Sequence, residues 1–236
     1  MTEIAPAATA GTPRNALVTG GNRGIGAAVC ALLHRLGYRV MLAARDGVAA
    51  QQAAAAIAPD VVPVTLDVTD AGSVCRAREV CGPVDVLVNN AGVLLDDGAP
   101  PSGVDLSLVR RTLAVNALGS WQVCQVFVPD MVSRGWGRVV MVSSGTGAFS
   151  NGLFAGAPAY SVSKAMLNAV TVLLAAELAG TGVLVNAVNP GMVRTRMMPQ
   201  ASRSTTDAAG DVVAAVELPD DGPHGVFLRH GRPSGW

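Results

Sequence analysis

The sequence has little charge, few aromatic residues and almost no histidine. Charged residues make up 14% of the 236 positions and aromatic residues 4%, and the formal net charge at pH 7 is zero. A chain without a positive field has little to attract a phosphate backbone, so we expect no nucleic-acid partner. The three histidines and four cysteines form no HExxH or CxxC arrangement. We therefore expect buried thiols and no metal site.

Long apolar runs are also missing. The N-terminal stretch MTEIAPAATAGTPR contains an acidic residue and lacks the apolar core of a signal peptide. No uninterrupted apolar run approaches the length needed to cross a bilayer. We expect a cytoplasmic protein with no membrane partner, in which residues 1–13 form a flexible tail.

What the sequence does have is a regular alternation of short apolar runs with longer helical patterns. Strands of four to seven residues joined by crossovers of helical length are typical of a parallel sheet covered on both faces. We predict an α/β fold: a single Rossmann-type domain over residues 14–236, with a doubly wound parallel sheet of about seven strands and helices on both faces. Residues 196–223 are expected to form a mobile flap and a short helix. The predicted strands are 16–19, 39–43, 61–66, 84–89, 138–143, 183–188 and 225–228, and the predicted helices include 25–36, 104–128 and 160–178.

A glycine-rich turn joins the first predicted strand to the first predicted helix. Residues 19–26 read TGGNRGIG, with the spacing Gly-x-x-x-Gly-x-Gly. Glycines without a Cβ let the backbone approach a pyrophosphate, and the N-terminus of the helix stabilises its charge. Between a strand and a helix, the motif indicates a dinucleotide site rather than a simple turn. The residues expected to form it are Gly20, Asn22, Arg23, Gly24, Ile25 and Gly26.

This motif resembles the cofactor motif of the short-chain dehydrogenase/reductase family. The resemblance covers about residues 14–195, and residues 222–236 resemble the end of carbonyl-reductase-like members. It implies a nicotinamide-dependent enzyme that moves a hydride to or from a carbonyl or alcohol carbon. The further matching segments, in family order, are 67–68, 89–92, 116, 143–144, the Tyr160-x-x-x-Lys164 pair and 189–191.

The Tyr160–Lys164 pair is the predicted catalytic centre. Two residues four apart on a helix share one face. A free tyrosine has a pKa of about 10, and a neighbouring ammonium together with an oxidised nicotinamide is expected to lower it, so that Tyr160 can act as acid and base. The resemblance assigns the substrate oxygen to Ser144, with Ser143 as the alternative. It also assigns to Asn116 a backbone distortion and a water relay from Lys164, unless Asn116 simply faces solvent.

The resemblance assigns further residues to the cofactor. Asn90 follows a strand at the ligand-binding edge of the sheet, and it either fixes the ribose region or steadies the sheet. Asp67 is expected to cap the adenine end. Thr195 is expected to contact the nicotinamide carboxamide, with an ordinary helix N-cap as the alternative. The resemblance also assigns Tyr160 and Lys164 to cofactor binding. The other residues that it assigns to cofactor binding, beyond the glycine turn, are Asp67, Val68, Asn90, Ala91, Gly92, Pro190, Gly191, Val193 and Thr195.

The choice between NADPH and NADH depends on the end of the second strand. NAD-specific folds place an acidic residue there. Here Arg45 comes first and Asp46 follows, while Arg23 adds a second cation from the glycine turn. Guanidinium groups bind a 2′-phosphate through paired hydrogen bonds, so the sequence favours NADPH. In the alternative, both arginines are solvated and Asp46 turns inward to select NADH.

The main prediction is an NADPH-dependent reductase of a small or medium apolar carbonyl compound. One alternative is a 3-oxoacyl-thioester reductase. Its carrier-protein substrate would favour a basic rim around the site, and only Arg194, Arg196 and Arg203 could form one. The others are a hydroxysteroid or alcohol dehydrogenase and a non-catalytic NADP(H)-binding sensor or scaffold. The apolar residues expected to border the site are Leu94, Leu95, Phe149, Leu153, Phe154, Met192, Met197 and Met198.

Two features concern the surroundings of the site. Ser144 and Tyr160 are sixteen positions apart, about three more than in many family members, which predicts an insertion within residues 145–158. The second feature is the apolar character of the helices predicted over 104–128 and 160–178, which relatives pair across an interface. We expect a homodimer or homotetramer, on the basis of Trp121, Phe127, Leu167 and Leu174.

Overall fold

The computed structural model describes residues 12–236, and an eight-stranded sheet forms its centre. The strand order is β3-β2-β1-β4-β5-β6-β7-β8, and every pairing is parallel except that of β7 with β8. The predicted doubly wound parallel sheet is therefore confirmed. The expected tail, residues 1–13, lies almost entirely outside the described residues. The strands are β1 Asn15–Thr19, β2 Arg39–Ala44, β3 Val62–Thr65, β4 Val86–Asn89, β5 Gly137–Val142, β6 Val183–Asn189, β7 Phe227–Arg229 and β8 Arg232–Ser234.

The eighth strand is the main difference from the predicted sheet. β8 turns back on β7 through His230 and Gly231, both at positive φ, and its three residues are exposed. A short exposed strand has no apolar pattern, so β8 could not be predicted from its residues.

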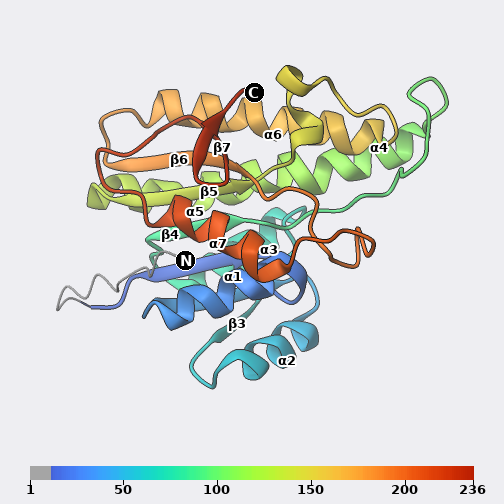
Figure 1. Ribbon diagram of the computed structural model, residues 1–236. Helices are drawn as coiled ribbons and strands as arrows, with labels where there is room; N and C mark the ends of the chain where they lie inside the picture. Colours follow the sequence, from blue (N-terminus) through green and yellow to red (C-terminus); the bar gives the residue numbers. More distant parts are fainter. Residues whose placement is uncertain (1–11) are drawn as a thin grey trace.

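Helices cover both faces of the sheet (Figure 1). One core cluster packs α3, α5 and α6 against one face, and a second packs α1, α2 and α7 against the other. Leu17 belongs to the first cluster while its neighbours Ala16 and Val18 belong to the second, as the alternation of side chains along a strand requires. The helices are α1 Gly24–Arg35, α2 Gly47–Ile57, α3 Ala71–Cys81, α4 Leu106–Leu113, the π-helix η1 Ala114–Gly119, α5 Ser120–Arg134, α6 Pro158–Glu177 and α7 Thr205–Val216, with the 3₁₀ turns η2 Gly145–Gly147 and η3 Phe149–Asn151.

Two helical segments differ from the predicted boundaries. The helix expected over 104–128 runs as α4, η1 and α5 from residue 106 to residue 134, through Pro129. Within 196–223, residues 196–204 are irregular and α7 follows them. Among the described helices, only α6 is long and apolar enough to cross a membrane. Half of its apolar window is buried inside the fold, as is typical of a core helix.

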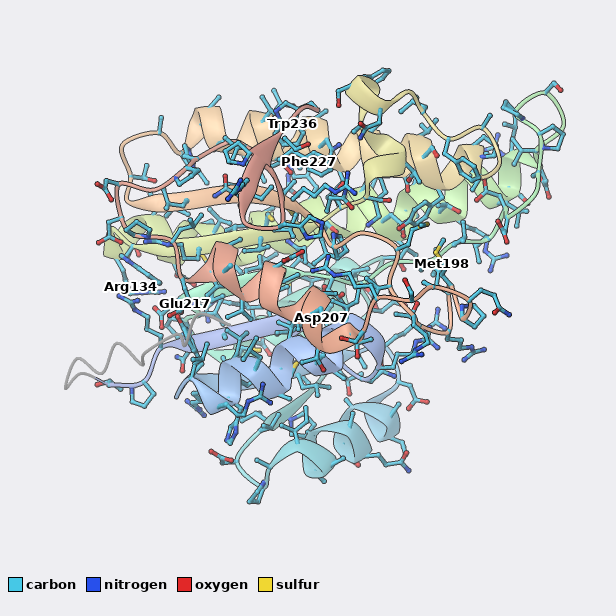
Figure 2. All side chains as sticks on the ribbon, viewed as in Figure 1. Arg134, Met198, Asp207, Glu217, Phe227 and Trp236 are labelled. Atoms are coloured by element: carbon cyan, nitrogen blue, oxygen red, sulfur yellow. The ribbon has the colours of Figure 1, made fainter. Side chains whose placement is uncertain are left out.

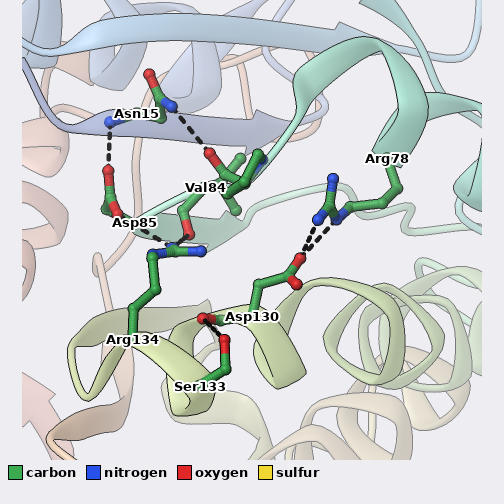
Figure 3. A network of polar contacts seen from close by, with 8 residues as sticks. Asn15, Arg78, Val84, Asp85, Asp130, Ser133 and Arg134 are labelled. Atoms are coloured by element: carbon green, nitrogen blue, oxygen red, sulfur yellow. Dashed lines mark hydrogen bonds and ion pairs between the residues drawn. The ribbon is translucent and has the colours of Figure 1, made fainter.

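A polar network fastens the amino-terminal edge of the sheet (Figure 3). Arg134 donates to the Val84 carbonyl and pairs with Asp85 at 3.1 Å, and Asp85 accepts the backbone N–H of Asn15 at 2.8 Å. An ion pair between Arg78 and Asp130 joins α3 to α5. These contacts brace the edge opposite the one where the predicted site residues lie.

Candidate active site

The predicted site residues gather at the carboxyl edge of the sheet. β1 ends at Thr19, β4 at Asn89, β5 at Val142 and β6 at Asn189. Because these four strands are parallel neighbours, the loops that follow them meet at one edge, where open α/β sheets bind ligands.

The glycine turn after β1 leaves no room for side chains. A Cβ on Gly20 would lie 2.9 Å from the Cα of Ala91, and one on Gly26 would lie 2.4 Å from the carbonyl oxygen of Gly20. Gly24 has a φ of +56°, and a Cβ there would face Thr195 Cγ2 at 3.5 Å. The turn therefore lies directly across from the loop that follows β6.

The N-terminus of α1 suits an anion. Arg23 occupies the N-cap position without a side-chain cap hydrogen bond, and the first turn of the helix contains no acidic residue. The positive end of the helix dipole is thus not neutralised by the helix's own side chains. Asn22 and Ile25 are half-buried in the same turn. A pyrophosphate fits this cradle by both shape and charge.

Asn90 braces the glycine turn. Its Nδ2 donates to the carbonyl oxygens of Thr19 at 2.9 Å and Gly20 at 3.0 Å. Thr19 Oγ1 in turn accepts the backbone N–H groups of Asn90 and Ala91, each at 3.0 Å. Two roles were predicted for Asn90, and these contacts are the ones expected if it steadies the sheet. Thr19 is a supporting residue that the sequence analysis missed.

Asn116 is buried and does not face solvent. Its side chain accepts the Val93 N–H at 2.8 Å and donates to the Val93 carbonyl and to Ser163 Oγ, each at 2.9 Å. It lies in the π-helix η1, so the backbone irregularity expected from the resemblance is present at this point. A Cβ on Gly92 would lie 3.5 Å from Asn116 Oδ1 and 3.9 Å from Lys164 Nζ, which places these three residues together.

Tyr160 and Lys164 share the first turns of α6, and burial acts on both. Burial raises the pKa of Tyr160 to about 12, and a hydrogen bond with Ser144 opposes part of that rise. Burial lowers the pKa of Lys164 to about 8. The Lys164 ammonium donates to the Val142 carbonyl at 2.8 Å and lies 5.7 Å from the centre of the tyrosine ring. In the protein alone, desolvation of the phenol outweighs the favourable contacts. The predicted lowering of the Tyr160 pKa includes the oxidised nicotinamide and stays a prediction.

The two neighbouring serines after β5 have different partners. Ser143 is buried and donates to Asn168 Oδ1 at 2.6 Å. Ser144 is half-buried and accepts from Thr146, whose hydroxyl lies 3.0 Å from Ser144 Oγ. Ser144 also opposes the rise in the Tyr160 pKa and so lies near the phenol. It is therefore the serine placed to reach a substrate oxygen beside the phenol.

Asp67 and Arg45 follow adjacent strands at the predicted adenine end of the site. β2 and β3 pair Ala44 with Thr65, so the residues that follow them lie close together. Asp67 Oδ1 accepts from the backbone N–H and the hydroxyl of Thr69, at 2.9 and 2.7 Å, and so stabilises a turn. Val68, the next predicted residue, is buried.

Asp46 is engaged by the backbone of α2. Its Oδ1 accepts the N–H groups of Val48 at 2.9 Å and Ala49 at 3.2 Å, so it caps the helix. Arg45 and Arg23 are both exposed. Neither arginine has an ion-pair partner within residues 12–236.

The loop after β6 is held in a defined turn. Gly191 has a φ of +75°, and its N–H donates to Asn189 Oδ1 at 3.0 Å. Pro190 precedes this glycine, and Val193 is buried. Thr195 Oγ1 accepts the N–H of Met197 at 3.2 Å in a turn, while the next helix begins at residue 205. The helix N-cap alternative for Thr195 is therefore wrong.

Asp96 is a supporting residue that the sequence analysis did not identify. It is 3% exposed, and its Oδ2 accepts the N–H of Ala159, the residue before Tyr160, at 2.6 Å. The N-cap position of α6 is Ala157, which has no side chain that could do this. Asp96 thus caps the helix from 63 residues away along the chain, a distance that no local pattern reveals.

An apolar rim of exposed side chains lies on the loops that follow β5 and β6, and one of them, Phe149, lines a hollow with Val172 of α6 and Trp236. Phe149 is 74% exposed and Met192 is 72% exposed, although large apolar side chains are normally buried. Leu94 and Leu95, after the Asn-Asn-Ala-Gly turn, are half-buried. The remaining exposed members of this apolar rim are Leu153, Phe154, Met197 and Met198.

Within the described residues, no group of three or more His, Cys, Asp or Glu side chains is placed to hold a metal ion. All four cysteines are free thiols, and burial raises the pKa of Cys30, Cys81 and Cys124.

Comparison with known proteins gives consistent matches. Residues 14–206 match the family described as short chain dehydrogenase. A 1-deoxy-11-beta-hydroxypentalenate dehydrogenase of Streptomyces exfoliatus is 37% identical over 86% of this chain and 76% of its own length. A galactitol 2-dehydrogenase (L-tagatose-forming) of Cereibacter sphaeroides is 38% identical over 77% of this chain and 72% of its own. The crystal structure of a 3-ketoacyl-(acyl-carrier-protein) reductase from Brucella melitensis, complexed with NADH, superposes with a TM-score of 0.84 at 25% identity, over 92% of this chain and 96% of that one.

Proposed function

The chain belongs to the short-chain dehydrogenase/reductase family, and from this premise we propose that it is an NADPH-dependent reductase of small to medium apolar carbonyl compounds. The family consists of oxidoreductases that act on alcohol or ketone groups with a nicotinamide cofactor. The choice of cofactor, the class of substrate and the role given to each residue are parts of our proposal.

The observation that carries the proposal is the complete polar set around Tyr160. Ser144 lies near enough to the phenol to lower its pKa, and the Lys164 ammonium lies 5.7 Å from the centre of its ring. Asn116 lies beside Lys164 across Gly92. A non-catalytic sensor or scaffold would need only the cofactor cradle, so this intact set argues for an enzyme.

The residues of the cradle fit a nicotinamide dinucleotide. The uncapped start of α1 would hold the pyrophosphate, and the turn of Pro190, Gly191 and Val193 with Thr195 would hold the nicotinamide end. When bound, the nicotinamide supplies the hydride. The facing positions of Gly24 and Thr195 support the use of both segments by one ligand.

Tyr160 is then the proton donor. With its pKa raised to about 12, the phenol holds its proton near neutral pH and can donate it to a carbonyl oxygen. The Ser144 hydroxyl is placed to orient that oxygen and to stabilise the developing alkoxide. Lys164, with a pKa of about 8, is charged at neutral pH and stabilises the phenolate that remains. The buried Asn116 fixes the loop that begins at Gly92 against α6.

The adenine end supports NADPH. Asp46 is engaged as the cap of α2, whereas Arg45 and Arg23 extend into solvent without ion-pair partners within residues 12–236. Two available guanidinium groups suit the 2′-phosphate, which carries close to two negative charges. The NADH bound to the Brucella neighbour is a property of that protein.

The substrate class follows from the rim. Phe154 and Met192 expose apolar surface that an apolar substrate would cover. A carrier-borne thioester would favour a basic rim, but the side chain of Arg203 is only 20% exposed and is engaged within the fold, which leaves Arg194 and Arg196. The expected cytoplasmic location stays a prediction.

A panel of carbonyl compounds, assayed by the loss of NADPH absorbance, tests the proposal. We expect turnover of apolar ketones or aldehydes and much weaker turnover of matched 3-oxoacyl thioesters and charged ketones. Preferential reduction of the thioesters would instead identify the 3-oxoacyl-thioester reductase. Absence of turnover with every carbonyl compound, together with oxidation of alcohols or hydroxysteroids, would favour the dehydrogenase alternative.

A further inference from the structure

Arg203 joins the loop after β6 to the helix that follows it. Its Nη1 donates to the Pro190 carbonyl at 2.5 Å, and its Nη2 donates to the Asp207 carbonyl at 3.1 Å. The same Nη2 lies 2.8 Å from Asp211 Oδ2. One guanidinium group therefore contacts the turn at residues 190–191 and two consecutive turns of α7.

The backbone of Arg203 makes a second connection to the same loop. Its carbonyl accepts the N–H of Arg194 at 2.8 Å, and Arg203 forms an isolated parallel bridge with Val193. Gly191, at a φ of +75°, lies directly beside the guanidinium group, since a Cβ there would be in van der Waals contact with Nη1 at 3.5 Å. Both ends of the segment 190–194 are thus held by one residue.

This arrangement is built into the fold and is not a surface accident. The side chains of Arg203 and Asp211 are 20% and 14% exposed, and His230 approaches the same carboxylate at 3.5 Å. The nearby Asp207 carboxylate accepts from Ser204 Oγ at 2.6 Å and so does not compete for the guanidinium group. Arg203 thus makes a partly buried ion pair with Asp211, and its guanidinium hydrogen bonds go to the Pro190 and Asp207 carbonyls.

α7 connects this loop to the other half of the cofactor cradle. Its buried face, which includes Val212 and Val213, packs with Val29 and Leu33 of α1 in one core cluster. α1 begins in the glycine turn, and Gly24 of that turn faces Thr195. Figure 2 labels Asp207 on α7 and Met198 in the irregular segment that leads to it. The segment from Arg203 to Asp211 is therefore placed to set the spacing between the two halves.

We propose that Arg203, held by Asp211, is a positioning residue that shapes the 190–195 loop to receive the nicotinamide end of the cofactor. The inference rests on the proposed function, because it assumes that this loop contacts the nicotinamide. Arg203 acts through Pro190 and Val193 and does not itself touch the reacting atoms. The adenine end, near Arg45, lies outside the reach of these contacts.

The test compares two nucleotides that share the adenine end. NADPH has a nicotinamide, whereas adenosine 2′,5′-bisphosphate has none, and the dissociation constants of both are measured by titration of the full-length protein. Arg203→Met keeps the length of the side chain but removes the guanidinium group. We expect this variant to raise the dissociation constant of NADPH by about tenfold or more. The dissociation constant of the bisphosphate should stay within about twofold of its wild-type value. Arg203→Lys retains the positive charge but lacks the paired N–H donors of the guanidinium group, and it should recover part of the lost NADPH affinity.

Two further variants keep the test decisive. Asp211→Asn should shift NADPH affinity in the same direction, which covers the case that Arg203→Met does not fold. Arg35→Met, at an exposed arginine on α1, is the control and should change neither affinity. Unchanged NADPH affinity in both Arg203→Met and Asp211→Asn would overturn the inference, as would equal weakening of both nucleotides. A wild-type protein that binds neither NADPH nor NADH would instead overturn the proposed function; if it prefers NADH, the same comparison is made with NADH and ADP-ribose.

Discussion

Burial shifts the pKa values of the two central residues in opposite directions. It raises the pKa of Tyr160 to about 12 and lowers that of Lys164 to about 8, and near neutral pH the first remains a neutral phenol and the second an ammonium. That pairing is the one that carbonyl reduction needs, with a proton donor beside a cation that can stabilise the resulting phenolate. Ser144, which opposes part of the rise in the Tyr160 pKa, is itself placed to bind the substrate oxygen.

The pKa of Lys164 predicts a pH dependence. Because burial lowers that pKa to about 8, Lys164 loses its charge as the pH rises through that value, and the phenolate left after proton transfer loses its stabilising partner. We expect kcat/KM for carbonyl reduction to be constant near neutral pH and to fall above about pH 8. Stopped assays over this range, with separate checks that the protein stays folded, measure the profile. Activity that rises steadily through pH 9 would contradict the assigned role of Lys164.

Cofactor choice is also decided by single residues. Arg45→Ala should weaken NADPH binding by roughly 1.5–3 kcal/mol, the range for a hydrogen bond to a charged group, and should change NADH binding little. Measuring kcat/KM with both cofactors for the wild type and the variant tests this, with the exposed Arg35→Ala as control. A wild-type preference for NADH would show that Asp46 decides the selection despite its role as a helix cap.

At the scale of elements, the N-terminus of α6 is capped by a residue from another segment of the chain. Ala157 offers no cap and Pro158 offers no N–H, so the buried Asp96 carboxylate supplies the cap at Ala159, directly before Tyr160. The loop that begins with the Asn-Asn-Ala-Gly turn is thereby tied to the helix that carries Tyr160. The predicted insertion is also held from outside its own segment, since the N–H of Ser150 donates to the Trp236 carbonyl at 2.7 Å.

Removal of the Asp96 cap should affect stability and turnover together. Asp96→Ala should lower the free energy of unfolding by about 0.5–2 kcal/mol, the usual range for a lost cap, and should lower kcat through displacement of Tyr160. Asp96→Asn keeps an acceptor and should lie between this variant and the wild type. The neighbouring exposed Asp97→Ala is the matched control. Denaturant unfolding and steady-state kinetics check both effects, and an Asp96→Ala protein with wild-type stability would contradict the capping role.

The part of the site that could be predicted from the sequence is the part built from contiguous residues. The glycine turn and the Tyr160–Lys164 pair depend on fixed local spacing, so the pattern alone indicated them. Asp96 and Arg203 could not be recognised in this way, because their partners are distant in sequence or depend on which way a side chain turns. Arg203 was expected on a basic rim, but its guanidinium group points inward to Pro190.

At the scale of the whole molecule, the apolar residues of α5 and α6 divide into two groups. Phe127, Leu167 and Leu174, from which an interface was predicted, are buried in the molecule's own core, and Trp121 packs against it. The three buried residues are therefore not part of a surface that would join two copies, whereas Trp121 is half-buried. Other apolar residues on η1 and α6 remain exposed, among them Leu118, Val162, Val172 and Leu173. The C-terminal Trp236 stacks on Phe227 with ring centres 5.4 Å apart (Figure 2), and so is held against β7.

We infer that this exposed face of α6 joins two copies of the chain. Light scattering of the wild type should give a mass of at least twice 23.9 kDa at micromolar concentration, and Leu173→Glu should reduce it by placing a charge in the interface. Val48→Glu, at an equally exposed apolar residue on α2, is the control. A wild-type protein that runs as a lone 23.9 kDa species would contradict the assembly.

The central claim is that Tyr160 donates the proton in carbonyl reduction, and Tyr160→Phe tests it most directly. This change keeps the ring that packs in the site and removes only the hydroxyl group. With an apolar carbonyl substrate and NADPH, we expect kcat to fall by roughly 10²–10⁴-fold, while the dissociation constant of NADPH stays within about twofold of wild type. A variant that retains more than about a tenth of wild-type turnover would contradict the account, because general acid catalysis by this hydroxyl is worth far more than that.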